Sequence, residues 1–176
     1  YCKKVVPWIC RQYGGDPGRV VLCGFSRGAI ACNYLGLHDD EIAKLWRAFI
    51  PYSHYDGVRR WGYPGSDKAA ALKRLQRLGA RPQCICHEDK GVSATKQYLK
   101  ETGIAGNFTI HATGFRNHND AWLLRPSPVR KTLRSWLETV LADCSLSTVP
   151  PRSLLFPAPS AARPSYDTRP PPPPPP

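Results

Sequence analysis

Short apolar runs alternate with helical patterns along most of this chain, and this order restricts the fold more than any other feature. The runs cover residues 19–25, 47–51, 83–86 and 108–112. Their apolar character is that of strands buried on both faces of a sheet. The segments between them are long enough for right-handed crossovers. Strand and helix alternate four times, which predicts an α/β fold with a mostly parallel sheet and helices on both faces.

Helix signals occupy the segments around these runs. Helices are expected over residues 3–13, 27–37, 40–46, 66–78, 92–101 and 128–142. Pro7 fits the first of these only near its first turn, because proline lacks the N–H that a helix interior uses. Ser66 is the expected N-cap of the fourth, and Gly79 follows where helices stop. The last helix has one apolar face, formed by Val129, Leu133, Trp136, Leu137, Val140 and Leu141.

The composition changes after residue 143. Pro, Ser and Arg dominate there, and residues 170–176 are all proline. Such a segment cannot join a helix or a sheet ladder, so residues 144–176 are predicted to form a disordered Pro-rich tail. Residues 1–143 are predicted to form one domain. The chain contains no methionine, so we expect it to be a fragment or a processed product that lacks its original N-terminus.

Charge, hydropathy and cysteine spacing exclude some function classes. The net charge is +12, but the basic residues are scattered along the expected helix faces, so specific nucleic-acid binding is not expected. No apolar run reaches the roughly 20 residues that a membrane-spanning helix needs. The seven cysteines lack the spacing of a disulfide framework. Cys84, Cys86 and His87 are too few for a metal site, so buried reduced thiols are expected there.

The pentapeptide Gly24-Phe25-Ser26-Arg27-Gly28 follows the first apolar run and precedes a helix. In this context G-x-S-x-G is typical of a sharp turn that strains the serine backbone and lifts its hydroxyl above the sheet. The two glycines are expected to let strand and helix approach closely. Ser26 is therefore the candidate nucleophile, and the backbone N–H of Arg27 is the candidate oxyanion donor. The alternative is a serine that only caps the helix.

A serine nucleophile needs a base, and the pattern predicts the chain order Ser, then Asp or Glu, then His. His118 follows the last apolar run and precedes the final helix, so its loop can reach back over the sheet to Ser26. The other histidines lie inside a run or come too early in the chain: His38, His54, His87 and His111. His118 is therefore the candidate base, and a histidine that bonds only within its own loop is the alternative.

Three carboxylates compete for the third role, which is to orient the imidazole and stabilise the imidazolium. Asp89 lies just past the third run and ranks first. It begins a D-x-x-V pattern, which is common after that strand in enzymes with a serine nucleophile at this kind of turn. Glu88 is adjacent, can turn inward instead, and ranks second. Asp56 follows the second run and ranks third.

Residues 3–142 resemble the C-terminal two-thirds of an α/β-hydrolase, in the small esterase and dienelactone-hydrolase-like branch. The resemblance rests on Gly24, Ser26 and Gly28, on the Asp89 region and on His118. It implies a serine hydrolase that cleaves small-molecule carboxylic esters through an acyl-serine intermediate, without a metal or an organic cofactor. The acyl and alcohol groups, the compartment and the oligomeric state do not follow from it.

The chain departs from that family at its beginning. The first strands of the sheet, and the loop that normally supplies a second oxyanion N–H, would lie before Tyr1. Losing one oxyanion donor costs about 100- to 1000-fold in rate, and an unpaired sheet edge invites aggregation. We therefore expect the parent protein to be an enzyme and this chain to be poorly active and poorly soluble.

Residues 55–63 lie between the second run and the next helix, a common place for substrate-binding insertions in this fold. Cations and aromatic rings occur together there, in Arg59, Arg60, Trp61 and Tyr63. Such a segment can hold an anionic or sugar-bearing substrate, and a well-packed loop without that role is the alternative.

Other function classes compete with the esterase. One is a catalytically inactive α/β-hydrolase-like binding module whose triad is incomplete. Another is a serine peptidase of the same fold. A third is a basic interaction protein that acts through its charge and its proline tail, because polyproline II docks to aromatic-lined grooves.

Overall fold

The sheet has four strands, which run parallel in the order β1-β2-β3-β4. They are β1 (Val21–Phe25), β2 (Ala48–Tyr52), β3 (Gln83–His87) and β4 (Phe108–Ala112). The computed structural model describes residues 1–143, and the predicted Pro-rich tail lies outside the described residues. The predicted α/β class with a parallel sheet is confirmed.

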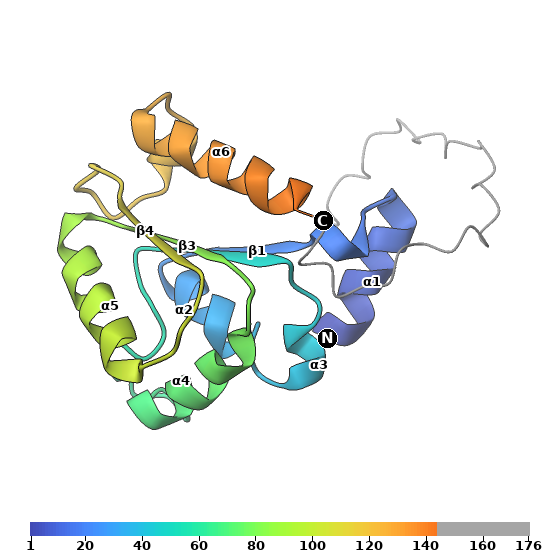
Figure 1. Cartoon of the computed structure of the whole chain (residues 1–176), viewed down its shortest axis with the longest axis horizontal. Coiled ribbons are helices and arrows are strands. Elements are labelled where there is room, and N and C mark those ends of the chain that lie inside the picture. Colours follow the sequence, from blue (N-terminus) through green and yellow to red (C-terminus); the bar gives the residue numbers. More distant parts are fainter. Residues whose placement is uncertain (144–176) are drawn as a thin grey trace, which may run out of the picture.

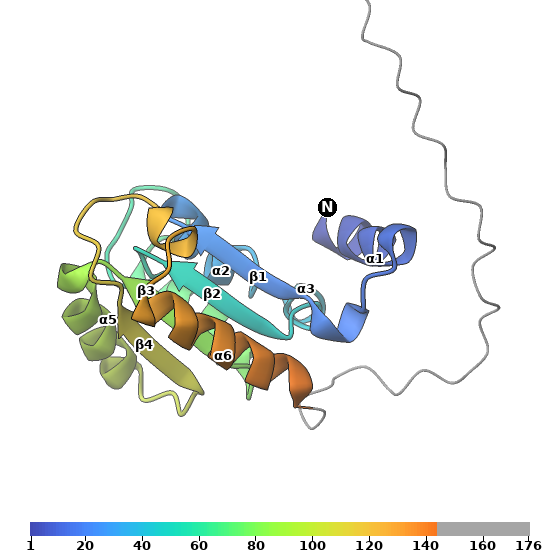
Figure 2. The same ribbon diagram turned by 90° about the horizontal axis from the view of Figure 1, so that it is seen from above.

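Six α-helices connect or flank these strands within residues 1–143. They are α1 (Cys2–Tyr13), α2 (Arg27–Tyr34), α3 (Asp40–Ala43), α4 (Lys68–Leu75), α5 (Asp89–Thr102) and α6 (Pro128–Ala142). Helix α6 covers one face of the sheet, and α2, α4 and α5 cover the other, as predicted (Figures 1 and 2). In the part of the chain that the structure describes, no helix combines the length and apolar character needed to cross a bilayer.

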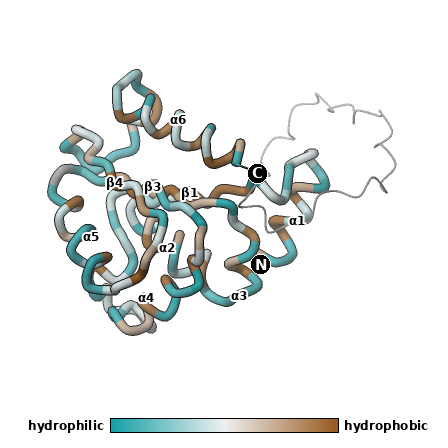
Figure 3. The backbone as a smooth tube through the Cα atoms, in the orientation of Figure 1, coloured by the Kyte–Doolittle hydropathy of each residue, from teal (hydrophilic) through white to brown (hydrophobic). Residues whose placement is uncertain are grey.

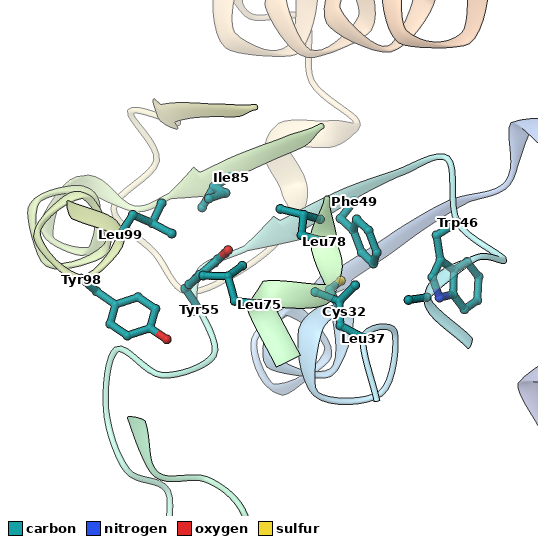
Figure 4. Packing of buried hydrophobic residues seen from close by; sticks show 11 residues of the cluster. Cys32, Leu37, Trp46, Phe49, Tyr55, Leu75, Leu78, Ile85, Tyr98 and Leu99 are labelled. Atoms are coloured by element: carbon teal, nitrogen blue, oxygen red, sulfur yellow. The ribbon is translucent and has the colours of Figure 1, made fainter. Parts of the chain in front are cut away.

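Each face of the sheet has its own hydrophobic core. On the α2, α4 and α5 side, the core includes Phe49, Leu75 and Ile85 (Figure 4). On the α6 side, Trp122 and Leu133 pack against side chains of β2 and β3. Figure 3 shows that hydrophobic residues concentrate along the sheet and on the side of α6 that faces it. Fully burying one large apolar side chain contributes about 1.5–3 kcal/mol, so both helix layers are held mainly by these contacts.

Three local expectations are wrong. Pro7 lies inside α1, beyond its first turn. The N-cap of α4 is Asp67, whose Oδ1 accepts from the N–H of Ala70 at 2.9 Å, whereas the Ser66 hydroxyl accepts from the backbone N–H of Trp61. Helix α5 begins three residues before the expected position 92, and Gly91 lies inside it. A Cβ at Gly91 would lie 2.3 Å from Nδ1 of His87, so this glycine allows the helix to pass over a buried imidazole.

Strands β1 and β4 are the outer strands among the described residues. β1 is only half-buried, and Cys23 at its centre is exposed. β2 and β3 are buried along their whole length. Of the two outer strands, β1 is the one that leads into Ser26.

Candidate active site

The candidate residues gather at the carboxyl edge of the sheet. Parallel strands end at the same edge, so the residues that follow them are brought together. Ser26 follows β1, Ser53 follows β2, and Glu88 follows β3. The loop after β4 runs back toward the ends of β1 and β2 (Figure 2). His118 belongs to this loop and contacts Ser26 and Ser53.

Ser26 is the single residue between β1 and α2. Its backbone has φ 56° and ψ −118°, a sparsely populated conformation that costs about 1–3 kcal/mol for a residue with a Cβ. The N–H of Ser26 donates to the carbonyl of Tyr52 at 3.0 Å, which ties the turn to β2. The Ser26 hydroxyl makes no capping bond to α2, so the alternative of a purely capping serine does not describe this turn.

The two glycines of the motif play different parts. A Cβ on Gly24 would lie 2.0 Å from the carbonyl oxygen of Gly28, so β1 and α2 approach too closely for any side chain there. A Cβ on Gly28 would meet nothing within 4 Å. The expectation that both glycines make room is therefore right for Gly24 and wrong for Gly28. Arg27 is the first residue of α2, so its N–H has no partner within the helix.

His118 lies beside Ser26, with 2.9 Å between its Nε2 and the serine Oγ. Its ring packs on Phe25, at 4.8 Å between centroids. The loop is anchored because the Tyr52 hydroxyl donates to the carbonyl of Asn119 at 2.8 Å. Trp122, fully buried, stacks edge-on against Tyr52 beneath the loop. The partner of His118 is 92 residues away in sequence, so this histidine does not bond only within its own loop.

The other ring nitrogen of His118 faces two oxygens. Nδ1 lies 3.2 Å from Oε1 of Glu88 and 3.1 Å from Oγ of Ser53. A carboxylate only accepts hydrogen bonds, so Nδ1 must carry the proton. Nε2 is then the acceptor, and the Ser26 hydroxyl donates to it. This is the tautomer that a general base next to a serine needs.

The three candidate carboxylates, Glu88, Asp89 and Asp56, differ in their surroundings. Glu88 reaches His118, as described above. Asp89 is the first residue of α5, and its side chain lies outside the described part of the structure. Asp56 is bound by Arg74, with Nε to Oδ2 at 2.8 Å, and both side chains are nearly buried. The structure therefore places Glu88, ranked second, next to the imidazole of His118. Asp56, ranked third, forms a buried ion pair with Arg74 instead.

Two further histidines flank the site. The His54 ring lies 5.6 Å from that of His118. Partial burial and the positive charge that His118 can carry lower the pKa of His54. His87 is fully buried, and burial lowers its pKa as well. Both imidazoles therefore favour the neutral form.

A cavity of about 470 Å³ lies beside the turn. It is lined by Arg27, Ile30, Ala31, Tyr34, Leu35, Trp61 and Tyr63. Two of the four candidate substrate-binding residues, Trp61 and Tyr63, are in this wall. The Arg59 guanidinium stacks on Trp61 at 3.9 Å, and Trp61 in turn contacts His54 at 4.9 Å between ring centroids. Arg60 is exposed and does not line the cavity.

Sequence reasoning missed Ser53 and His54. Both directly follow a buried strand, and residues in that position face the carboxyl edge of a parallel sheet. That signal was available, because the end of β2 was predicted correctly to within one residue. Among residues 1–143, no group of three or more His, Cys, Asp or Glu side chains is arranged to hold a metal ion.

A scan against protein-family models finds no matching family, and a search of curated proteins finds no match either. What this chain does is therefore inferred from its own residues.

The difference between Gly24 and Gly28 gives the first prediction. Gly24→Ala is expected to destabilise the fold by about 3 kcal/mol or more, because its Cβ meets a backbone carbonyl that cannot move freely. Gly28→Ala is the matched control and is expected to gain about 0.5–1 kcal/mol, because alanine is favoured over glycine in a helix. Chemical denaturation of both variants measures the two values. Equal stability of the variants would contradict the close approach of β1 and α2.

Proposed function

We propose that this chain is a serine hydrolase of the α/β-hydrolase type that cleaves carboxylic esters through an acyl-serine intermediate. Ser26 is the nucleophile, His118 the general base, and Glu88 the carboxylate that stabilises the imidazolium. The observation that carries the proposal is the 2.9 Å contact of the Ser26 hydroxyl with Nε2 of His118, whose Nδ1 faces Glu88. A nucleophile bonded to a base that a third group orients is the arrangement such chemistry requires.

In the first half of the reaction, Oγ of Ser26 attacks the ester carbonyl carbon while Nε2 of His118 takes the hydroxyl proton. The carbonyl oxygen becomes an oxyanion, and the N–H of Arg27 is placed to donate to it. The tetrahedral intermediate collapses when the C–O bond to the alcohol breaks. His118 then gives its proton to the leaving alkoxide, and the acyl group stays on Ser26.

In the second half, a water molecule takes the place of the alcohol. Nε2 of His118 removes a proton from this water as its oxygen attacks the acyl carbon. The bond to Oγ of Ser26 breaks, the serine recovers its proton from His118, and the carboxylic acid leaves. Glu88 balances the positive charge on His118 in both halves without taking the proton itself.

The lining of the cavity next to the Ser26 turn favours a substrate in which one of the two groups joined by the ester is apolar. Apolar or aromatic side chains form most of its wall, and Arg27 is its one cationic member. Its volume of about 470 Å³ lies in the range of small-molecule pockets. Arg27, which directly follows Ser26, lines this cavity, so we propose that the cavity receives the acyl chain or aryl group of the ester.

A fluorophosphonate probe tests the function directly. The activated serine oxygen displaces fluoride from phosphorus, so one adduct should form on Ser26, as read by mass spectrometry of its peptide. Ser26→Ala should abolish labelling, and His118→Asn should slow it by at least about 1000-fold. Because labelling is a single turnover, it detects even a slow enzyme. p-Nitrophenyl butyrate hydrolysis, lost in the same variants, tests full turnover.

Ser135→Ala is the matched control, since Ser135 is an exposed serine on α6, away from the carboxyl edge. It should label and turn over at the wild-type rate. A wild-type chain that labels no faster than Ser26→Ala would remove the hydrolase proposal and favour the binding module.

The acid is tested by a pair of isosteric changes. Glu88→Gln removes the charge beside His118 and should slow labelling by at least about 100-fold, as loss of a triad carboxylate does. Asp89→Asn is the matched change at the next residue and should leave the rate unchanged. The opposite result would make Asp89 the acid, in agreement with its higher rank from the sequence.

The cavity is tested by reducing its volume. Ala31→Leu adds side-chain volume to its wall. It should lower kcat/KM for p-nitrophenyl hexanoate about tenfold and leave that for the acetate unchanged. Ala69→Leu is the control, because Ala69 is exposed on α4 and does not line the cavity. Equal losses on both esters would show that the cavity does not bind the acyl chain.

A further inference from the structure

Ser53 shares the Nδ1 proton of His118 with Glu88. Its Oγ lies 3.1 Å from Nδ1, which is slightly closer than the 3.2 Å of the Glu88 oxygen. Nε2 is occupied by Ser26, so Nδ1–H is the one proton that the neutral ring can donate. Both oxygens are within hydrogen-bond distance of it.

The backbone of Ser53 is unusual in the same way as that of Ser26. Among residues 1–143, these two serines are the non-glycine residues with positive φ, at 84° for Ser53 and 56° for Ser26. One contacts Nδ1 of His118 and the other contacts Nε2. Such strained residues persist only where their surroundings hold them, and they concentrate at functional sites. The two strained serines therefore hold the imidazole between them.

A buried network keeps Ser53 in this conformation. Its N–H donates to the carbonyl of Cys86 at 2.9 Å. Its carbonyl accepts from Nδ1 of His87 at 2.9 Å, and the hydroxyl of Thr95 donates to Nε2 of the same ring at 2.8 Å. Both nitrogens of His87 are thus satisfied with a single proton. Gly91 leaves the space that this ring occupies.

Glu88 and Ser53 differ in how firmly they are held. The Glu88 carboxylate is at the end of a long side chain that is 19% exposed. The Ser53 hydroxyl is one carbon away from a backbone that is bonded on both sides and is 6% exposed. Glu88 therefore places a negative charge beside Nδ1 of His118, whereas Ser53 offers a hydrogen-bond acceptor whose position is fixed. His54 is the other titratable group that faces the ring, and it makes no bond to Nδ1.

We propose that Ser53 is a positioning residue for His118: its hydroxyl accepts the Nδ1–H bond beside Glu88 and holds the ring in the tautomer whose Nε2 faces Ser26. The consequence for catalysis rests on the proposed hydrolase function. The effect on the tautomer does not, because it is a property of the resting protein.

Ser53→Gly tests the inference without adding strain. Glycine adopts φ 84° freely, so this variant loses the hydroxyl and should fold at least as well as the wild type. With ¹⁵N-labelled histidine at about pH 8, where free histidine is neutral, long-range ¹H–¹⁵N correlation reads the tautomer of His118. The wild type should show Nδ1–H, and Ser53→Gly should show a clear gain of Nε2–H. The labelling rate of Ser26 should fall about 3- to 10-fold, the effect of one lost neutral hydrogen bond.

Ser53→Ala separates the hydroxyl from the backbone. It should match the tautomer and rate of Ser53→Gly and be less stable, because alanine is strained at this φ. Ser135→Ala again serves as the control, with an unchanged tautomer. An unchanged tautomer in Ser53→Gly overturns the inference, whatever the labelling rate. A tautomer change in a chain whose wild type does not label supports the role of Ser53 and refutes the hydrolase function instead.

Discussion

The close approach of β1 to α2 determines the geometry of the whole site. With 2.0 Å between a hypothetical Cβ at Gly24 and the Gly28 carbonyl oxygen, the helix begins directly against the strand that precedes it. One residue must then reverse the chain, and Ser26 does so at φ 56°. Its hydroxyl is consequently held at the carboxyl edge of the sheet. His118 reaches this hydroxyl from the loop after β4.

The sheet itself supports the strain. Each strained serine directly follows a strand and donates its N–H to a carbonyl at the end of the next strand, Ser26 to Tyr52 and Ser53 to Cys86. Thr113, which follows β4, makes a similar bond in the opposite direction across the sheet, because its N–H donates to His87 of the preceding strand β3. The parallel ladder thus continues one residue past the strands, and these bonds help offset about 1–3 kcal/mol of strain at each serine. The two serines that contact His118 thus gain fixed positions from the same ladder that holds the core.

The sequence predicts the elements that follow from local residue patterns. It does not predict features that depend on contacts between residues far apart in the chain. Buried parallel strands are continuous apolar runs, so the four strands and the two helix layers could be read directly. The helix start at residue 89 could not, because Gly91 looks like a loop residue until the His87 ring beneath it is known. That the Glu88 carboxylate reaches His118 depends on how its side chain turns, which the sequence does not show. The positive φ of Ser53 has no local signature, since tertiary hydrogen bonds impose it.

Three histidines at the carboxyl edge of the sheet are buried to different extents. His87 is fully buried and His54 partly so, and burial lowers the pKa of each. His118 has a side chain that is 53% exposed and a carboxylate beside it. More exposed than the other two rings, His118 also contacts the carboxylate of Glu88. Because His54 and His87 favour the neutral form, neither ring places a positive charge beside His118. The three rings are chemically alike, and their surroundings alone distinguish His118, the base of the proposed hydrolase, from the other two.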